Sequence, residues 1–220
     1  MGARTGREFL EGLSKPREIW VGDDKVSDIP SHPAFAGAAK TMAQIFDLQH
    51  QARDVCLMPD PETGEPINLS HMIPRSLDDL KRRHSCLQTI AEFTVGLMGR
   101  TPDYMNVTFA GFAGRADEWA VNGNDRGAAN LVAYQKFLRR HDISLTHTII
   151  HPTIDKSKGD IPEPGNQVAL RKVADTAHGI VVRGARILAT LAPFADEIAV
   201  YPAIPLAEGT DEYALSFCIP

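Results

Sequence analysis

The spacing of apolar residues changes once along the chain, near residue 142, and this change limits the folds that the sequence can adopt. Before it, apolar residues recur at intervals of three and four, which is typical of amphipathic helices. After it, they alternate with polar residues in short runs bounded by glycine and proline, which is typical of strands. The sequence therefore predicts an α+β protein, with a mainly helical domain over residues 1–141 and an antiparallel β domain over residues 142–220.

Helix-start signals divide the first domain into elements. Thr5, with Glu8 three residues later, forms a capping box that predicts a short helix over residues 4–14. Ser76 is the expected cap of a longer helix, which we expect to be the central helix of this domain and to run on to Gly99. Other signals predict a small β-hairpin over 17–29, a helix over 34–50, a loop or hairpin tip over 59–66 and a helix over 128–140.

The clearest strand covers residues 143–150, where apolar and polar residues alternate and β-branched residues are frequent. Alternation puts His147 on the face that carries Leu145 and Ile149, so we expect His147 to face inward. Turn signals separate the later apolar runs, which predict further antiparallel strands over 168–174, 179–190, 197–201 and 213–219.

The segment 98–106 gathers a guanidinium, a carboxylate and a phenol, which belong to Arg100, Asp103 and Tyr104. Gly99 and Pro102 interrupt regular structure there. We therefore expect a corner at a helix end, where a rigid scaffold presents polar side chains to a ligand. For these residues taken alone, the alternative is a surface turn with a solvated arginine.

Composition and charge argue against several classes of protein. The 220 residues are 43% hydrophobic and 23% charged, and the chain has no apolar run of about 18 residues that would span a membrane. The amino end lacks the apolar core of a secretory signal, so we expect a cytoplasmic protein. The net charge is −5 and basic residues are scattered among acidic ones, which argues against a nucleic-acid partner.

Cysteine and histidine spacing predicts neither a disulfide framework nor a metal site. Cys56, Cys86 and Cys218 are odd in number and far apart, so we expect reduced, mostly buried thiols. The histidines other than His147 share no spacing that would suit a metal ion, and we assign no metal to them.

Several short motifs occur in an order that is characteristic of one family. The Gly-Arg-Thr-Pro-Asp-Tyr block at 99–104 is the most specific of them. The others are Arg-Thr-Gly-x-Glu-x-Leu at 4–10, Ser-His-Pro at 31–33, Asp-Pro-Glu-Thr-Gly-Glu at 60–65, Ile-Pro-Arg-Ser at 73–76, His147, Asp-Lys-Ser at 155–157, Gly-Ile-Val-Val at 179–182, Gly-Ala at 184–185 and Ala-Thr at 189–190. Over nearly the whole chain, these motifs resemble the oxygenase component of 4-hydroxyphenylacetate 3-monooxygenase and related two-component flavin-dependent phenol hydroxylases.

The resemblance implies the fold of acyl-CoA dehydrogenases, which have a helical domain, a β domain and a carboxy-terminal helix bundle. Chains of the resembled family are much longer than this one. We therefore expect a fragment, a domain or a degenerate relative that holds the amino-terminal and middle domains without the bundle. About half of an active site would lie in it.

The activity that the resemblance implies is ortho-hydroxylation of a 4-substituted phenol, such as 4-hydroxyphenylacetate, to a catechol through a C4a-hydroperoxide of reduced FAD. Attack on the ring is faster when the phenolic oxygen is negatively charged, so the pocket needs cationic donors or a base around that oxygen. By the resemblance, Arg100 would stabilise the charge, Tyr104 would offer a hydrogen bond and His147 would accept or share the proton. The implied substrate-binding residues, in a pocket between the two domains, are Arg100, Thr101, Pro102, Asp103, Tyr104 and His147.

The resemblance also implies flavin contacts from the strand with the histidine, the loop beyond it and a later threonine. Lys156 stands where the family has an arginine, and lysine lacks the planar fork that grips a phosphate bidentately. His151, Thr153 and Leu191 also depart from the family pattern. The resemblance makes FAD the expected cofactor, with FMN as the alternative. Because of the departures, we expect the affinity for the flavin to be reduced. The implied contacts are His147, Thr148, Ile149, Thr153, Ile154, Asp155, Lys156 and Thr190.

The implied partners are dioxygen, a phenolic substrate, a separate flavin reductase and further copies of the chain in a homotetramer or dimer. One alternative is a truncated, non-catalytic relative that acts as a fold or oligomerisation module. A weaker one is a 4-hydroxybutyryl-CoA dehydratase-like enzyme, which shares the fold and a Gly-Ile-Val-Val-Arg-Gly-Ala-like strand at 179–185. That enzyme binds an iron–sulfur cluster through cysteines near the Arg100 region, where this sequence has none.

Overall fold

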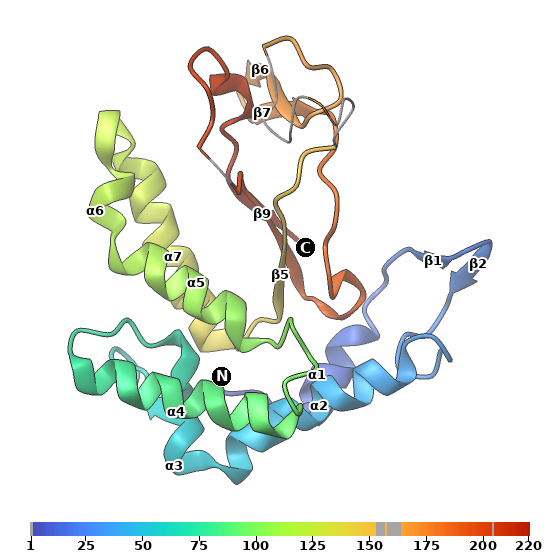
Figure 1. The fold of residues 1–220 in the computed structure, drawn as a ribbon, viewed down its shortest axis with the longest axis vertical. Helices are drawn as coiled ribbons and strands as arrows, with labels where there is room; N and C mark the ends of the chain where they lie inside the picture. Colours follow the sequence, from blue (N-terminus) through green and yellow to red (C-terminus); the bar gives the residue numbers. More distant parts are fainter. Residues whose placement is uncertain (1, 153–156, 158–163, 204) are drawn as a thin grey trace. The chain divides into compact units, whose positions relative to one another are not determined.

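The computed structural model describes residues 2–152, 157, 164–203 and 205–220, and the chain divides into two compact units, Met1–Ser144 and Leu145–Pro220 (Figure 1). The first unit is built mainly from helices, and the second from small sheets and short turns. The sequence boundary expected at 141 lies at the last residue of the final long helix. Among the described residues, no helix is both long enough and apolar enough to cross a membrane.

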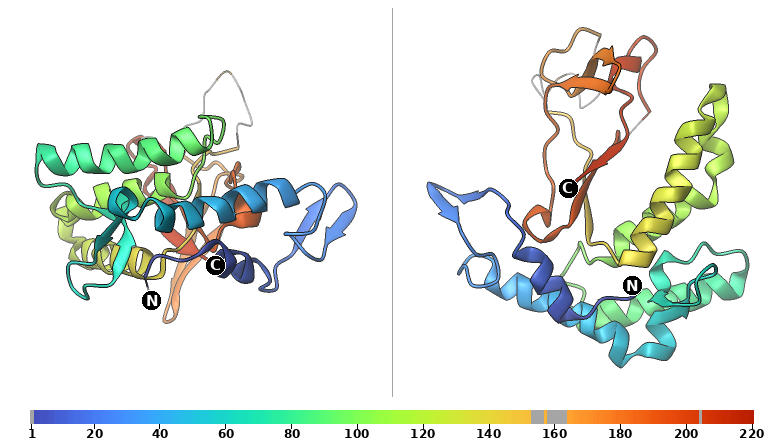
Figure 2. Two further views of the ribbon diagram at one scale, coloured as in Figure 1. Left: turned by 90° about the horizontal axis from the view of Figure 1, so that it is seen from below. Right: turned by 180° about the vertical axis from the view of Figure 1, so that it is seen from behind.

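Packed helices form the frame of the first unit, in which α1 (Gly6–Leu13) lies against α2 (Ala36–Gln51) and α5 (Asp103–Gly114) lies against α7 (Asp125–His141) (Figure 2). The predicted capping box is confirmed: the Thr5 hydroxyl accepts from the Glu8 N–H at 3.3 Å, and the Glu8 carboxylate accepts from the Thr5 N–H at 2.7 Å. Phe9 stacks on Phe46 with ring centroids 4.8 Å apart, which fixes α1 on α2. The helices and 3-10 turns of this unit are α1 (Gly6–Leu13), α2 (Ala36–Gln51), α3 (Arg53–Cys56), η1 (Leu69–His71), α4 (Leu77–Phe93), α5 (Asp103–Gly114), α6 (Ala116–Trp119), η2 (Val121–Gly123) and α7 (Asp125–His141).

Two antiparallel hairpins complete the first unit at the places where the turn composition predicted them. The first turns at Gly22, which has a φ of 60° that glycine adopts without strain. It stands away from the helices (Figures 1 and 2), and Trp20 on it is exposed. The proline-rich segment 59–66 is the tip of the second. Their strands are β1 (Ile19–Val21), β2 (Asp24–Val26), β3 (Leu57–Pro59) and β4 (Pro66–Asn68).

The helix α4 begins at its predicted cap, Ser76, but ends at Phe93 rather than running on to Gly99. Val95 and Gly96 after it have left-handed backbone, with φ of 55° and 68°. Such residues terminate a helix because they turn the chain away from the helix axis. A valine is rare in this conformation, so the apolar spacing gave no warning of the helix end.

The expected central position of α4 is also wrong. Its buried side chains are Cys86 and Ile90, whereas Leu77 and Leu80 in its first turn are exposed. Some of the periodic apolar positions of this helix therefore face solvent. Only a narrow stripe of its side chains contacts the rest of the first unit. Cys86 and Ile90 pack in a core cluster with Ile45, Cys56, Leu69 and Met72.

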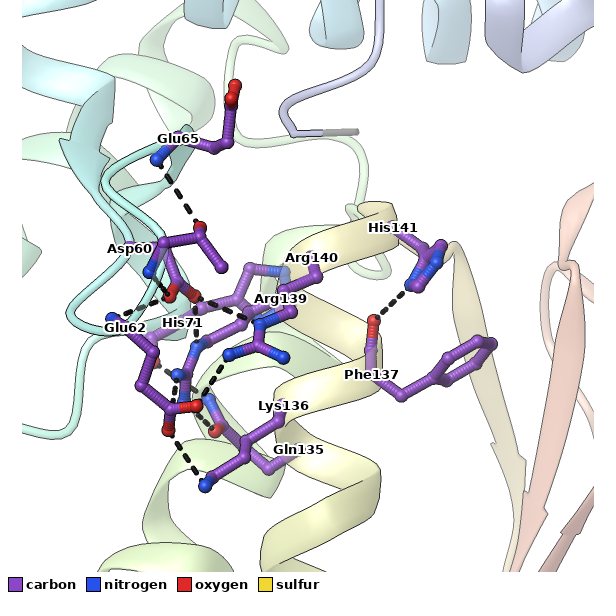
Figure 3. Close-up of polar contacts among 11 residues, drawn as sticks. Asp60, Glu62, Glu65, His71, Gln135, Lys136, Phe137, Arg139, Arg140 and His141 are labelled. Carbon is purple, nitrogen blue, oxygen red and sulfur yellow. Dashed lines mark hydrogen bonds and ion pairs between the residues drawn. The ribbon is translucent and has the colours of Figure 1, made fainter.

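A buried ion pair joins the tip of the β3–β4 hairpin to α7 (Figure 3). Arg139 Nε lies 2.6 Å from Asp60 Oδ2, and the two side chains are 8% and 0% exposed. Burial acts to raise the pKa of Asp60, but the Arg139 hydrogen bond and the backbone N–H groups of Glu62 and Thr63 outweigh it and hold the pKa well below its usual range. Glu62 forms a more exposed ion pair beside it, in which Glu62 Oε1 lies 2.7 Å from Lys136 Nζ.

A second buried carboxylate, Asp142, connects separate segments of the first unit just after α7. Its backbone is left-handed, with a φ of 47°, and caps the helix. Its Oδ2 accepts from the Arg4 N–H at 2.9 Å and from Gln49 Nε2 at 2.8 Å, and its Oδ1 lies 3.9 Å from His71 Nε2. Burial acts to raise the pKa of Asp142, but His71, Arg4 and Gln49 together lower it.

A third buried carboxylate, Asp103, is the first residue of α5 and is 7% exposed. Here burial prevails and raises the pKa, against a weaker opposing hydrogen bond from Thr101. Asp103 lines a small hollow that has room for about one water molecule. Polar residues that line the same hollow are Gln49, Asn68, Asn106 and Asp142.

The sheet of the second unit is mixed, which corrects the expectation of a wholly antiparallel β domain. The strand β5 (Leu145–Thr148) pairs in parallel with β8 (Glu197–Val200), and β8 pairs antiparallel with β9 (Phe217–Ile219). Local alternation does not encode strand direction. The segment 149–196 is long enough to return the chain to the same end of the sheet, which a parallel pair requires.

The strands β6 (Arg171–Thr176) and β7 (Gly179–Arg183) form a separate antiparallel hairpin. The strand predicted over 179–190 stops earlier because Gly184 has a φ of 116° and lies so close to the Ala169 carbonyl that a side chain would collide with it. The strand predicted over 213–219 is also shorter, since a 3-10 turn precedes it. The turns of this unit are η3 (Ala192–Phe194) and η4 (Asp211–Tyr213).

Replacing Arg139 with methionine should lower the free energy of unfolding by up to about 3–5 kcal/mol, because the buried Asp60 carboxylate loses its hydrogen-bonded cation and keeps only Arg140, whose Nε lies 3.8 Å from Asp60 Oδ2. Urea unfolding measures the loss, which should shrink below about pH 4 as the carboxyl binds a proton. The matched control is Lys136→Met, which removes a more exposed partner of Glu62 and should change stability much less. Equal losses in the two variants would contradict the assignment.

Replacing Asp103 with asparagine should make stability less sensitive to rising pH. The raised pKa means that folded Asp103 binds more protons than unfolded Asp103, so wild-type stability falls as the pH rises from about 3.9 through the raised value. Asparagine stays neutral and removes that fall. Urea unfolding at about pH 4 and about pH 7 should therefore favour the variant more at the higher pH.

The control for the Asp103 variant is Asp117→Asn. Asp117 is exposed, and a hydrogen bond from Arg115 lowers its pKa, so its charged form is favoured in the folded protein. Its replacement should shift the pH dependence in the opposite direction. If the Asp103 variant instead loses more stability at neutral pH than in acid, the carboxylate of Asp103 is stabilised by the fold and the prediction fails.

Candidate functional site

The corner at residues 99–104 lies between α4 and α5 in the first unit. The exposed Arg100 guanidinium lies 5.1 Å from the centre of the Tyr104 ring, and Arg100 Nη1 donates to the Gly99 carbonyl oxygen at 3.2 Å. A guanidinium over an aromatic face is attracted to it without losing its charge. Arg100 and Tyr104 therefore lie together, with the cation of Arg100 open to a ligand.

The residues between them turn toward the interior. Pro102 has a φ of −54° and directly precedes α5, so the proline begins a helix as well as interrupting the loop. Pro102 and Asp103 are buried and Thr101 is half-buried. The roles of these three residues in substrate binding stay predictions. Their burial fixes the base of the corner that carries Arg100 and Tyr104.

His147 lies in β5 of the second unit and is half-buried. Its Nδ1 is 2.8 Å from the hydroxyl oxygen of Tyr201, and the two rings meet edge to face at 81°, with centroids 5.7 Å apart. Thr146, on the opposite face of the strand, is fully buried, so both faces of β5 are covered here. Imidazole readily takes up or releases a proton near neutral pH, which suits His147 to proton transfer.

The segment 187–190 runs beside β5 and is held there by hydrogen bonds. The Thr146 hydroxyl donates to the Thr190 carbonyl oxygen, and the Thr148 hydroxyl donates to the Ile187 carbonyl oxygen at 2.9 Å. The Ile187 N–H donates to the Ile150 carbonyl oxygen at 3.0 Å. Of the expected flavin contacts that the structure describes, Thr190 is thereby held beside Thr148, whereas His147 lies on the opposite face of β5 and Ile149 directly follows the strand.

These groups suit an organic cofactor. Thr148 and Thr190 supply hydroxyl and backbone groups, and Ile149 supplies apolar surface, which is the mixture of groups that sites for organic cofactors use. Within the described ranges, no cluster of three or more histidine, cysteine or acidic residues could hold a metal ion. The remaining expected flavin contacts lie outside the described residues: Thr153, Ile154, Asp155 and Lys156.

Sequence reasoning missed Tyr201 and Arg186. Arg186 Nη1 donates to the carbonyl oxygens of Ile149 at 3.0 Å and Tyr201 at 3.2 Å, and burial lowers its pKa. The alternation of residues 197–201 could have placed Tyr201 on one face of a strand. The sequence did not show that the neighbouring strand is the one that carries His147. Arg186 follows the end of β7 and carries no periodic signal.

Comparisons with known proteins give the family. The family described as 4-hydroxyphenylacetate 3-hydroxylase N terminal matches residues 5–220. The 4-hydroxyphenylacetate 3-monooxygenase oxygenase component of Thermus thermophilus is 36% identical over 99% of this chain and 44% of its own length. A crystal structure of such an oxygenase component, complexed with FAD and 4-hydroxyphenylacetate, has a TM-score of 0.88 and 36% identity, covering 99% of this chain and 45% of that one.

A dehydratase shares the fold at much lower identity. The archaeal 4-hydroxybutyryl-CoA dehydratase from N. maritimus has a TM-score of 0.86 at 18% identity, over 99% of this chain and 43% of that one. Identity this low shows a common fold and nothing about activity.

The chain spans somewhat less than half the length of the relative and of the solved structures named above. The family match nevertheless covers both units, and with them the corner at 99–104, the strand β5 and the segment 187–190. A match of this extent, with 36% identity to the Thermus thermophilus protein, is decisive for the family. The chain belongs to the 4-hydroxyphenylacetate 3-hydroxylase family and corresponds to its N-terminal region.

Proposed function

We propose that this chain is part of the oxygenase component of a two-component aromatic hydroxylase. It would use reduced FAD and dioxygen to convert a 4-substituted phenol to a catechol by ortho-hydroxylation. The observation that carries the proposal is the match of residues 5–220 to the family, with 36% identity to an oxygenase component. The related structure with FAD and 4-hydroxyphenylacetate supports both the cofactor and the class of substrate.

Three side chains are proposed to act on the phenolic oxygen. Arg100 is an exposed cation held over the Tyr104 ring, and it would stabilise negative charge on that oxygen. Tyr104 would donate a hydrogen bond to the same atom. His147 would accept the phenolic proton at Nε2, the ring nitrogen opposite the one that contacts Tyr201.

Transfer of the proton from the phenol to His147 would activate the ring. The phenolic O–H bond breaks, its electron pair stays on oxygen and the proton moves to His147. The resulting negative charge makes the ring carbon ortho to the oxygen more nucleophilic, while Arg100 holds the charge in place. Bound reduced flavin, together with dioxygen, supplies the electrophilic oxygen atom that this carbon attacks.

The flavin would lie along β5 and the segment 187–190. The hydrogen bonds that hold Thr190 and Ile187 beside β5 support this placement, because they bring Thr190 beside Thr148, in the strand that also carries His147. We include Thr153, Ile154, Asp155 and Lys156 in the same site on the strength of the motif. Lysine offers a phosphate one charge without a fork, and FMN is therefore kept as the alternative to FAD.

A separate reductase is the proposed source of reduced flavin, since the relative is named an oxygenase component. We also propose that the full-length protein is a homotetramer or a dimer. Two exposed apolar side chains of the first unit support association: Val95 is 78% exposed and Leu97 is 88% exposed. Exposed apolar surface of this kind is stabilised when another protein surface covers it.

The His147→Ala variant of the full-length protein should make catechol from 4-hydroxyphenylacetate at least about 100-fold more slowly, because the phenolic proton has no acceptor. Hydrogen peroxide release from reduced FAD and dioxygen should persist. Chromatography of the catechol and a peroxide assay measure both. His178→Ala, at an exposed histidine of the β6–β7 turn, is the matched control. Equal catechol formation by the two variants would refute the role of His147.

A further inference from the structure

The parallel pairing of β5 and β8 brings His147 and Tyr201 to one face of the sheet. In the register, His147 lies beside Ala199. Side chains two residues apart along a strand share a face, so Tyr201 continues the face on which Ala199 and His147 lie. The register thus explains why the Tyr201 hydroxyl reaches His147 Nδ1 at 2.8 Å.

The tyrosine is also held firmly from its own backbone. Arg186 Nη1 donates to the Tyr201 carbonyl oxygen and to the Ile149 carbonyl oxygen, which ties the ends of the two strands together. Pro202 follows Tyr201, and a residue before proline is restricted to extended conformations. These contacts restrain the backbone of Tyr201, and the contact with Nδ1 places its phenol beside the imidazole.

We propose that Tyr201 is the positioning residue of His147, an inference that rests on the proposed function. The Nδ1–H of His147 donates to the Tyr201 hydroxyl oxygen, which fixes the tautomer and leaves the lone pair on Nε2. When Nε2 takes the phenolic proton, the Nδ1–H bond remains in place, and the Tyr201 oxygen stabilises the charged ring. In other proteins, the group that hydrogen-bonds the second ring nitrogen of a functional histidine sets the orientation and the basicity of the imidazole in this way.

The tautomer can be measured without turnover. Nitrogen-15 NMR of the histidine-labelled chain at about pH 8.5, above the ordinary range of imidazole, distinguishes a protonated ring nitrogen from an unprotonated one. We expect His147 to show a protonated Nδ1 and an unprotonated Nε2, and Tyr201→Phe to shift both signals toward a mixture of tautomers. A protonated Nε2 in the wild type, or unchanged signals in the variant, overturns the proposal.

The control for the NMR experiment is Tyr213→Phe. Tyr213 lies in the same unit, and its hydroxyl donates to the Asn166 carbonyl oxygen at 2.9 Å. The variant therefore loses one hydrogen bond of a tyrosine hydroxyl without touching His147, and the His147 signals should stay at their wild-type positions. A Tyr213 variant that shifts these signals as much as Tyr201→Phe overturns the specific role of Tyr201.

Turnover of the full-length protein gives the second test. Tyr201→Phe should lower the rate of catechol formation about tenfold or more, while the KM for 4-hydroxyphenylacetate changes by less than about twofold. Tyr213→Phe should retain the wild-type rate, and an equal loss in both variants overturns the positioning role. If the wild type itself makes no catechol, the proposed function fails, whereas the NMR result still decides whether Tyr201 sets the tautomer.

Discussion

The buried carboxylate of Asp142 is the constraint on which the first unit depends. A charge taken out of water is tolerated only where several partners meet it, and here they come from distant parts of the chain: the Arg4 backbone, Gln49 of α2 and His71 of η1. The amino-terminal segment, α2 and the end of α7 must therefore all be in place together. The hollow beside Asp142 also borders Asp103, so the base of the Arg100 corner rests on the same interior.

Three buried aspartates in this unit show how surroundings decide the state of one chemical group. Asp60 and Asp142 have cationic or N–H partners, and their pKa values are lowered despite burial. Asp103 has weaker partners, and burial raises its pKa. The first two hold hairpin, helix and terminus together through charge, whereas Asp103 is better accommodated when neutral.

Features set by neighbouring residues could be predicted from the sequence. The Thr5 and Ser76 caps were found because capping depends on residues three apart. Features set by distant residues could not. The parallel partner of β5 lies beyond the segment 149–196, and the burial of Asp103 contradicts the usual exposure of acids. The corner residues were located by their motif, but the contact of His147 with Tyr201 required the strand register.

The parallel pair of β5 and β8 has a consequence for the order of folding. During synthesis, Arg4, Gln49, His71 and Asp142 are all present once the helical unit has been made, so that unit can close early. The strand β5 must wait until β8 has been synthesised, because its parallel partner lies beyond the segment 149–196. His147 therefore acquires its tyrosine partner only when most of the second unit has been made.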